Sequence, residues 1–139
     1  MNTEENKIQT NISPSEAGEY STPYISLRIE DGILFGTWAD NTHVNLEVAK
    51  ECVKARLKFQ NSISYPALID MRGVKSASKE AREYMANEGA QLITAGALLI
   101  DSLLTRTIGN IFLTINKPPV PSKLFTEEQK AIEWLKQFV

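Results

Sequence analysis

The sequence predicts a single α/β domain with a mostly parallel sheet, an antiparallel hairpin at its start, and helices covering the faces. Three observations predict it. Short apolar runs alternate with segments of helical spacing, a strong hairpin turn lies near the start, and 139 residues suit one domain. The expected order of elements is β-β-α-β-α-β-α-β-α, and such alternation favours parallel strands joined by helical crossovers.

Residues 1–23 are rich in Asn, Ser, Thr, Glu and Pro and show no period, so they are predicted to be a flexible tail. The domain is expected to span residues 24–139. The acidic, polar start does not resemble a signal peptide, and the apolar region 92–115 is interrupted by Asp101 and Arg106. These features predict a cytoplasmic protein with no membrane span.

The hairpin comes first in the predicted domain. Residues 24–29 alternate in polarity, Asp31-Gly32 is a two-residue turn signal, and residues 33–38 return as the second strand. Asn45 is the expected N-cap of the first helix, which should end near residues 60–62. Its predicted buried stripe consists of Leu46, Ala49, Cys52, Val53 and Leu57.

A compact apolar run, Ala67 to Ile69, predicts a central strand buried on both faces. Residues 74–77 are expected to form a loop that leads to Ser78, the cap of a second helix ending near Gly89. That helix is expected to turn Ala81, Tyr84 and Met85 inward.

The second half of the chain repeats this alternation. Residues 97–100 predict another interior strand, and Ser102 caps a third helix that ends at Asn116 and the following prolines. Residues 120–125 are expected to be an edge strand, because Pro121 is tolerated only there. Thr126 has the form of a capping box for the last helix. Along the third helix, five apolar residues lie at helical spacing: Leu104, Ile108, Ile111, Phe112 and Ile115. The last helix is expected to pack through Ala131, Ile132, Leu135 and Phe138.

The element order, residues 65–73, the strand at 97–101 and the ending 117–125 followed by 127–135 resemble the STAS/SpoIIAA-like family. The likeness is strongest to small bacterial SpoIIAA-like proteins without an assigned activity. The resemblance implies a SpoIIAA-like fold. The group includes anti-sigma-factor antagonists, which bind proteins under the control of phosphorylation, and lipid-binding relatives of the CRAL-TRIO type.

In the antagonists, the phosphorylated residue lies in an Asp-Ser-Ser/Thr-Gly motif between the central strand and the next helix. Ser76 and Ser78 occupy the matching place and are the candidate phosphorylation sites. However, no Asp precedes a Ser there and no Gly follows one. Ser76 and Ser78 are also explained as helix caps, since a helix N-terminus needs a side-chain acceptor.

A crevice is the second candidate site. Asp70, Arg72, Asp101, Arg106 and Asn110 fall at the carboxyl ends of two strands or on the helix that follows, where α/β sheets place their ligands. An arginine fork suits carboxylates or phosphates, so these residues could recognise a ligand or partner. Alternatively, the charges form a structural ion-pair network, and Arg106 is an exposed helical residue.

Other classes of function are disfavoured by the sequence. A net charge of −2 argues against a general nucleic-acid binder, and the single Cys52 excludes an intramolecular disulfide. His43 is the only histidine and has no metal-ligand spacing with Cys52, so no metal site is expected. The sequence has no Gly-rich phosphate loop and no serine nucleophile elbow, so no cofactor or catalytic constellation is expected. We therefore expect a non-enzymatic regulatory or protein-interaction domain with an unknown protein partner. The alternative is a binder of a small apolar or lipid-like ligand, and a homodimer is left open.

Overall fold

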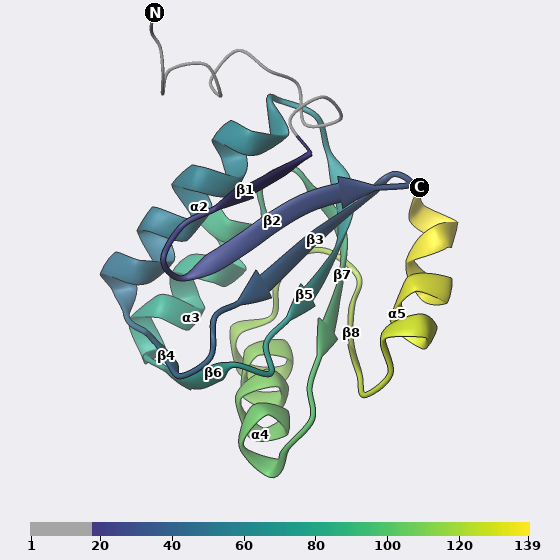
Figure 1. The fold of residues 1–139 in the computed structure, drawn as a ribbon. Coiled ribbons are helices and arrows are strands. Elements are labelled where there is room, and N and C mark those ends of the chain that lie inside the picture. Colours follow the sequence, from purple (N-terminus) through teal and green to yellow (C-terminus); the bar gives the residue numbers. More distant parts are fainter. Residues whose placement is uncertain (1–17) are drawn as a thin grey trace, which may run out of the picture.

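Parallel and antiparallel pairing share one six-stranded sheet in the computed structural model, which describes residues 18–139 (Figure 1). The strand order is β1-β2-β3-β5-β7-β8; β1 to β3 pair antiparallel, and the rest pair parallel. This confirms the predicted fold class. The strands are β1 (Glu19–Ser21), β2 (Ile25–Glu30), β3 (Ile33–Trp38), β5 (Tyr65–Asp70), β7 (Ile93–Leu99) and β8 (Ser122–Phe125).

Regular structure begins within the segment that was predicted to be a tail. Residues 19–21, assigned to the tail from their composition, form β1 and pair with β2, while residues 1–17 lie outside the described residues. The hairpin between β2 and β3 turns at Asp31 and Gly32 as expected. Both residues have positive φ, 52° and 79°, the geometry that the twist of a two-residue hairpin requires.

A second, two-stranded parallel sheet was not predicted. It pairs β4 (Thr42–Val44) with β6 (Val74–Ala77), so the loop expected at residues 74–77 is wrong. Each strand is too short to show a periodic pattern. Only the approach of two segments thirty residues apart reveals the pairing.

The helices are α2 (Leu46–Gln60), α3 (Lys79–Ala86), η2 (Glu88–Ala90), α4 (Leu103–Ile111), η3 (Phe112–Asn116), α5 (Glu128–Leu135) and η4 (Lys136–Phe138). The caps at Asn45, Ser78 and Ser102 are confirmed, since each side chain accepts a backbone N–H from the first turn. The capping box at Thr126 is wrong. Helix α5 starts after Glu127, which makes no side-chain cap bond.

Helices cover both faces of the sheet (Figure 1). Helices α2, α3 and α4 pack on one face, where Leu34, Ala67 and Leu98 point, and α5 packs alone on the other, against Phe35 and Leu68. Successive residues of a strand point to opposite faces, so both faces of β5 meet apolar side chains. Ile69, however, is only partly buried, because it borders a cavity on the α2–α3–α4 face.

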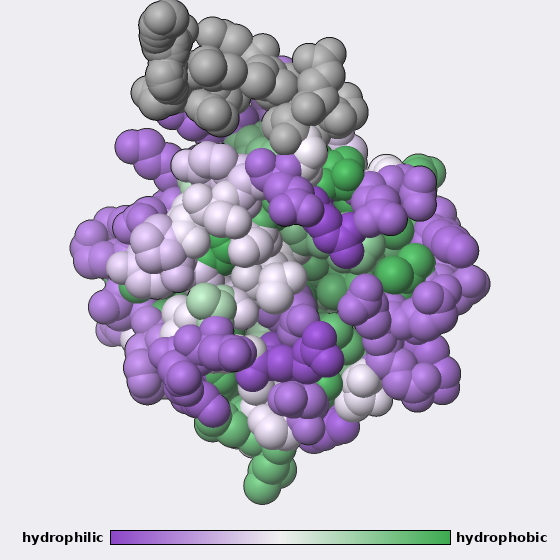
Figure 2. Space-filling view, in the orientation of Figure 1, coloured by the Kyte–Doolittle hydropathy of each residue, from purple (hydrophilic) through white to green (hydrophobic). Residues whose placement is uncertain are grey.

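The antiparallel end of the sheet has no helix on the α5 side. There Ser26 and Thr37 are exposed, and the guanidinium carbon of Arg28 lies 4.0 Å from the centre of the Phe35 ring. This part of the surface is pale to purple in Figure 2, from intermediate to hydrophilic, as expected for an antiparallel sheet with one face exposed to solvent. Within residues 18–139, no helix is long and apolar enough to cross a membrane.

Candidate functional site

The carboxyl ends of the parallel strands meet at one edge of the sheet, at the bottom of the view in Figure 1. We call this region the carboxyl edge. Strands β4 and β6 lie beside it, and α4 begins there. The backbone N–H of Met71 donates to the carbonyl of Leu99 at 3.0 Å, which holds the segment after β5 against the end of β7. The two predicted strand-end positions therefore do lie together.

Asp70 and Arg72 form a bidentate ion pair at this edge. Nε of Arg72 donates to Oδ1 of Asp70 at 2.9 Å, and a terminal nitrogen donates to Oδ2 at 2.7 Å. The side chain of Asp70 is 15% exposed and that of Arg72 is 47% exposed. The hydrogen bonds with Asp70 raise the pKa of Arg72 above its usual value. The arginine fork is thus directed at a carboxylate of its own chain.

The negative charges of Asp101 and Glu128 also raise the pKa of Arg72, after the larger effect of Asp70. Arg106 and Asn110 lie further along α4 and are exposed. Within residues 18–139, Arg106 forms no ion pair. The structure therefore pairs Asp70 with Arg72, places Asp101 just after the neighbouring strand β7, and leaves Arg106 without an ionic partner in the described chain. A recognition role for these residues stays a prediction.

The two candidate serines differ in their surroundings. Ser76 lies on β6, is exposed, and has its Oγ 2.8 Å from Nδ1 of His43 on β4. Ser78 caps α3, and its Oγ accepts the backbone N–H of Ala81 at 3.1 Å. Only Ser76 therefore presents a hydroxyl that is not already used to begin a helix.

Two exposed leucines at the start of α4 were missed by the sequence analysis. Leu103 is 81% exposed and Leu104 is 45% exposed, and Figure 2 shows a green protrusion at this end of α4. Helical spacing does not imply burial here, since Ile115, which shares the spacing of Leu104, is 70% exposed. The first turn of α4 projects beyond the sheet (Figure 1). The available signal was an apolar pair placed directly after the Ser102 cap.

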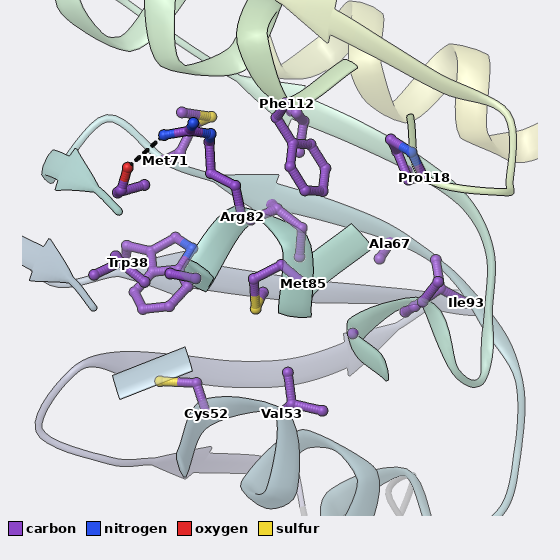
Figure 3. Close-up of a pocket in the computed structure, with 18 of the residues that line it drawn as sticks. Trp38, Cys52, Val53, Ala67, Met71, Arg82, Met85, Ile93, Phe112 and Pro118 are labelled. Carbon is purple, nitrogen blue, oxygen red and sulfur yellow. Dashed lines mark hydrogen bonds between the residues drawn. The ribbon is translucent and has the colours of Figure 1, made fainter. Parts of the chain in front are cut away.

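A separate cavity of about 160 Å³ lies between the sheet and the layer formed by α2, α3, α4 and η3 (Figure 3). Its wall is mainly apolar and includes Trp38, Val53, Ile69, Met85, Ile93 and Phe112. Ile69, Met85, Ile93 and Phe112 are partly exposed, whereas Trp38 and Val53 are buried. The cavity therefore runs from the core toward the surface.

Cys52 borders this cavity and is 3% exposed. Burial raises the pKa of its thiol, and a hydrogen bond with Thr22 lowers it by a smaller amount, so that the pKa is about 11. A thiol of this kind carries little thiolate at neutral pH and is a poor nucleophile. Among residues 18–139, no group of three or more His, Cys, Asp or Glu side chains is placed to hold a metal ion.

The fold is found in solved structures. An anti-sigma factor antagonist from Mycobacterium paratuberculosis is 18% identical, with a TM-score of 0.61 over 84% of this chain and 99% of that one. An uncharacterized protein from Shewanella loihica PV-4, from the DUF3478 family with a SpoIIAA-like fold, is 16% identical, with a TM-score of 0.58 over 85% and 99%. This confirms the SpoIIAA-like fold.

A protein with unknown function from Arthrobacter sp. FB24 is 31% identical over 79% of this chain and 97% of that chain, with a TM-score of 0.31. No curated protein matches the chain. The model of one family, described as "Domain of unknown function (DUF7793)", matches residues 27–139. These residues run from within β2 to the end of the chain and include every helix named above, so the chain belongs to the DUF7793 family.

Proposed function

We propose that the chain is a non-enzymatic regulatory domain that binds a partner protein in the cytoplasm through the carboxyl edge. The observation that carries the proposal is the exposure of Leu103 and Leu104 at the start of α4. An apolar pair in contact with water, bordered by charges, is typical of the centre of a protein-binding surface. The SpoIIAA-like fold supports a partner protein, since one structure that shares it is an anti-sigma factor antagonist.

The surrounding charges suit the rim of such a surface. Asp70 and Arg72 neutralise each other, and Asp101 and the exposed Arg106 add one charge of each sign. Rim charges of this kind contribute more to the rate and selectivity of association than to affinity. The carboxyl edge can therefore select a partner by complementary charge around the two leucines.

Ser76 is the serine that we propose as a phosphorylation site within this surface. Its hydroxyl is exposed, and a phosphate there would add about two negative charges and new acceptors beside His43. The Oγ of Ser78 is engaged in capping α3. Mass spectrometry of the protein isolated from its own cells tests this, and a phosphate on Ser78 with none on Ser76 would contradict it.

The partner proposal is tested by affinity capture from native cell extract with two matched variants. Leu103→Glu places a charge in the proposed centre, whereas Ile115→Glu changes a similarly exposed side chain at the other end of the same helical segment. We expect a protein captured by the wild type and by Ile115→Glu to be lost with Leu103→Glu. Equal capture by all three would show that the leucines are not the binding surface.

The same pair of variants distinguishes self-association from binding to a different protein. If the partner is a second copy of the chain, light scattering of the purified wild type will report a dimer that Leu103→Glu converts to a monomer. Leu103 is so exposed that neither outcome should involve a change in folding, and circular dichroism checks this.

A second candidate function, binding of a small apolar ligand, is favoured by the cavity beneath α2, α3 and α4. Its volume of about 160 Å³ is close to that of an engineered cavity of about 150 Å³ that binds benzene. Pockets for drug-sized ligands are larger, about 300–1,000 Å³. The cavity therefore suits a molecule of a few carbon atoms rather than a membrane lipid with two acyl chains.

A further inference from the structure

The cavity has an unusual balance of charge for an apolar site. Two arginines, Arg56 and Arg82, contribute to its wall, and no acidic side chain of the described chain does. Neither arginine forms an ion pair with any residue in the range 18–139. Positive charge beside a low-dielectric space without a carboxylate attracts an anion.

The guanidinium group of Arg56 is already hydrogen-bonded within the protein. Its terminal nitrogens donate to the carbonyls of Gly89 and Gln91 at 2.9 and 3.0 Å, and also to the side chain of Gln60. The residue is 6% exposed, so this fork is occupied and enclosed. Arg56 contributes a positive potential to the cavity but has little freedom to bind a ligand directly.

Arg82 on α3 is different. Its Nε donates to Oδ1 of Asn116 at 3.1 Å, and Nη1 donates to the carbonyl of Ala77 at 2.7 Å. Nη2 has no hydrogen-bond partner among the described residues. Arg82 is partly buried, and its two neutral acceptors hold the guanidinium group in place. A fixed cation with a remaining donor therefore lies in the wall of the cavity.

Figure 3 shows how this cation is placed along the cavity. The guanidinium group of Arg82 lies toward the side of Trp38 and Met71, while Ile93 and Pro118 lie at the opposite side. The space between them is bordered by Met85, Phe112 and other apolar groups. A molecule with one polar end and an apolar body would match this order of groups.

We propose that the cavity binds a small apolar carboxylic acid, with its carboxylate bonded to Arg82 and its hydrocarbon part against Met85 and Phe112. This inference rests on the second candidate function and specifies its ligand. The volume limits the body to about the size of benzene. A carboxylate loses its water when it enters such a space, and a charge-assisted hydrogen bond from a held guanidinium offsets that loss.

Two probes of similar size separate the contribution of the carboxylate to binding from that of the apolar ring. Benzoate carries the carboxylate, whereas toluene has the same ring with a methyl group in its place. The chain contains three methionines, and Met71 and Met85 border the cavity. Labelling the methionine methyl groups of the full chain with ¹³C therefore gives a simple spectrum in which two signals report directly on the cavity.

We expect benzoate to shift the Met71 and Met85 signals in a saturable manner. Arg82→Gln should weaken benzoate binding roughly tenfold or more, since a hydrogen bond to a charged group is lost, and should leave toluene binding nearly unchanged. Lys79→Gln, which also removes a positive charge from α3 but at an exposed position outside the cavity wall, is the matched control and should bind benzoate like the wild type.

Arg82→Lys controls for a general disruption of the fold by a change at this position. It keeps the positive charge and should therefore retain part of the benzoate affinity. If toluene shifts the cavity signals and benzoate does not, or if Arg82→Gln binds benzoate as tightly as the wild type, the carboxylate proposal is wrong while an apolar cavity site stands. If neither probe shifts Met71 or Met85, the second candidate function fails together with this inference.

Discussion

The guanidinium group of Arg56 donates a hydrogen bond to the side-chain oxygen of Gln60, one turn later on α2, and both side chains are buried. The network extends beyond the helix. Arg56 also donates to the carbonyls of Gly89 and Gln91, and the amide of Gln60 donates to the carbonyl of Leu92 at 2.9 Å. These bonds tie the end of α2 to the segment that enters β7.

Replacement of Arg56 by Met should therefore destabilise the protein strongly. The change keeps the apolar stem but leaves one buried and two partly buried acceptors without their donor, at about 1–3 kcal/mol for each that water does not reach. We expect a total loss of about 3 kcal/mol or more in the free energy of unfolding, measured with urea. Arg106→Met, at an exposed position, is the control and should change it by less than about 0.5 kcal/mol. A similar small effect for Arg56→Met would show that the network does not stabilise the fold.

Cys52 predicts a loss of stability at high pH. The thiol has a pKa of about 11 in the folded chain against 9.0 ordinarily, so between these values the unfolded chain has released a proton that the folded chain retains. The unfolded state then binds fewer protons, and the free energy of unfolding decreases as the pH rises from about 9 to about 11.

Urea denaturation of the wild type and of Cys52→Ala across this pH range, under reducing conditions, isolates the effect. The stability difference between the two proteins should be constant below pH 9 and should then change in favour of Cys52→Ala. Other groups, Arg56 among them, titrate in both proteins and cancel. A difference that stays flat up to pH 11 would contradict the raised pKa.

Gly73 is expected to tolerate no side chain. A Cβ at this position would lie 2.5 Å from the carbonyl oxygen of Ala39 and 2.9 Å from that of Trp38, and backbone atoms cannot move aside as a flexible side chain can. Gly73→Ala should cost about 1–3 kcal/mol or more. Gly89→Ala is the comparison, because its nearest contacts would be an ordinary 3.5 Å. Equal stability of the two variants in thermal unfolding would refute the close approach.

Leu68 and Ile69 are consecutive on β5 and face opposite layers. Leu68 is 2% exposed against α5, whereas Ile69 is partly exposed and borders the cavity. Leu68→Ala should cost about 2–5 kcal/mol, the usual range for a buried large-to-small change. Ile69→Ala should cost less, because part of its surface contacts no protein atoms in the wild type. A larger loss for Ile69→Ala in urea denaturation would show that the cavity wall is as tightly packed as the opposite layer.

Local signals in the sequence were sufficient for most of the architecture. The Asp31-Gly32 turn, the caps at Asn45, Ser78 and Ser102 and the edge strand near Pro121 all lie where they were predicted. Each depends on conformational preferences or on bonds between residues a few positions apart. The same is true of the pairing of charges between Asp70 and Arg72, two residues apart.

The features missed by the sequence analysis depend on contacts between distant segments. The pairing of β4 with β6, and of β1 with β2, joins strands too short to carry a period. In the sequence, Arg56 and Gln60 look like ordinary polar residues of a helix. Only the folded structure shows that they donate hydrogen bonds to backbone carbonyls in residues 89–92.

The two candidate sites were decided by tertiary structure alone. Whether an apolar side chain on α4 is covered depends on where the sheet ends, so Leu103 and Leu104 could not be recognised as exposed from their spacing. The cavity exists because three helices and the sheet do not fill the space between them, and Arg82 lies in its wall through bonds to Ala77 and Asn116. Residue type and local spacing set the secondary structure, whereas packing across the layers determined which groups remain available to a ligand or a partner.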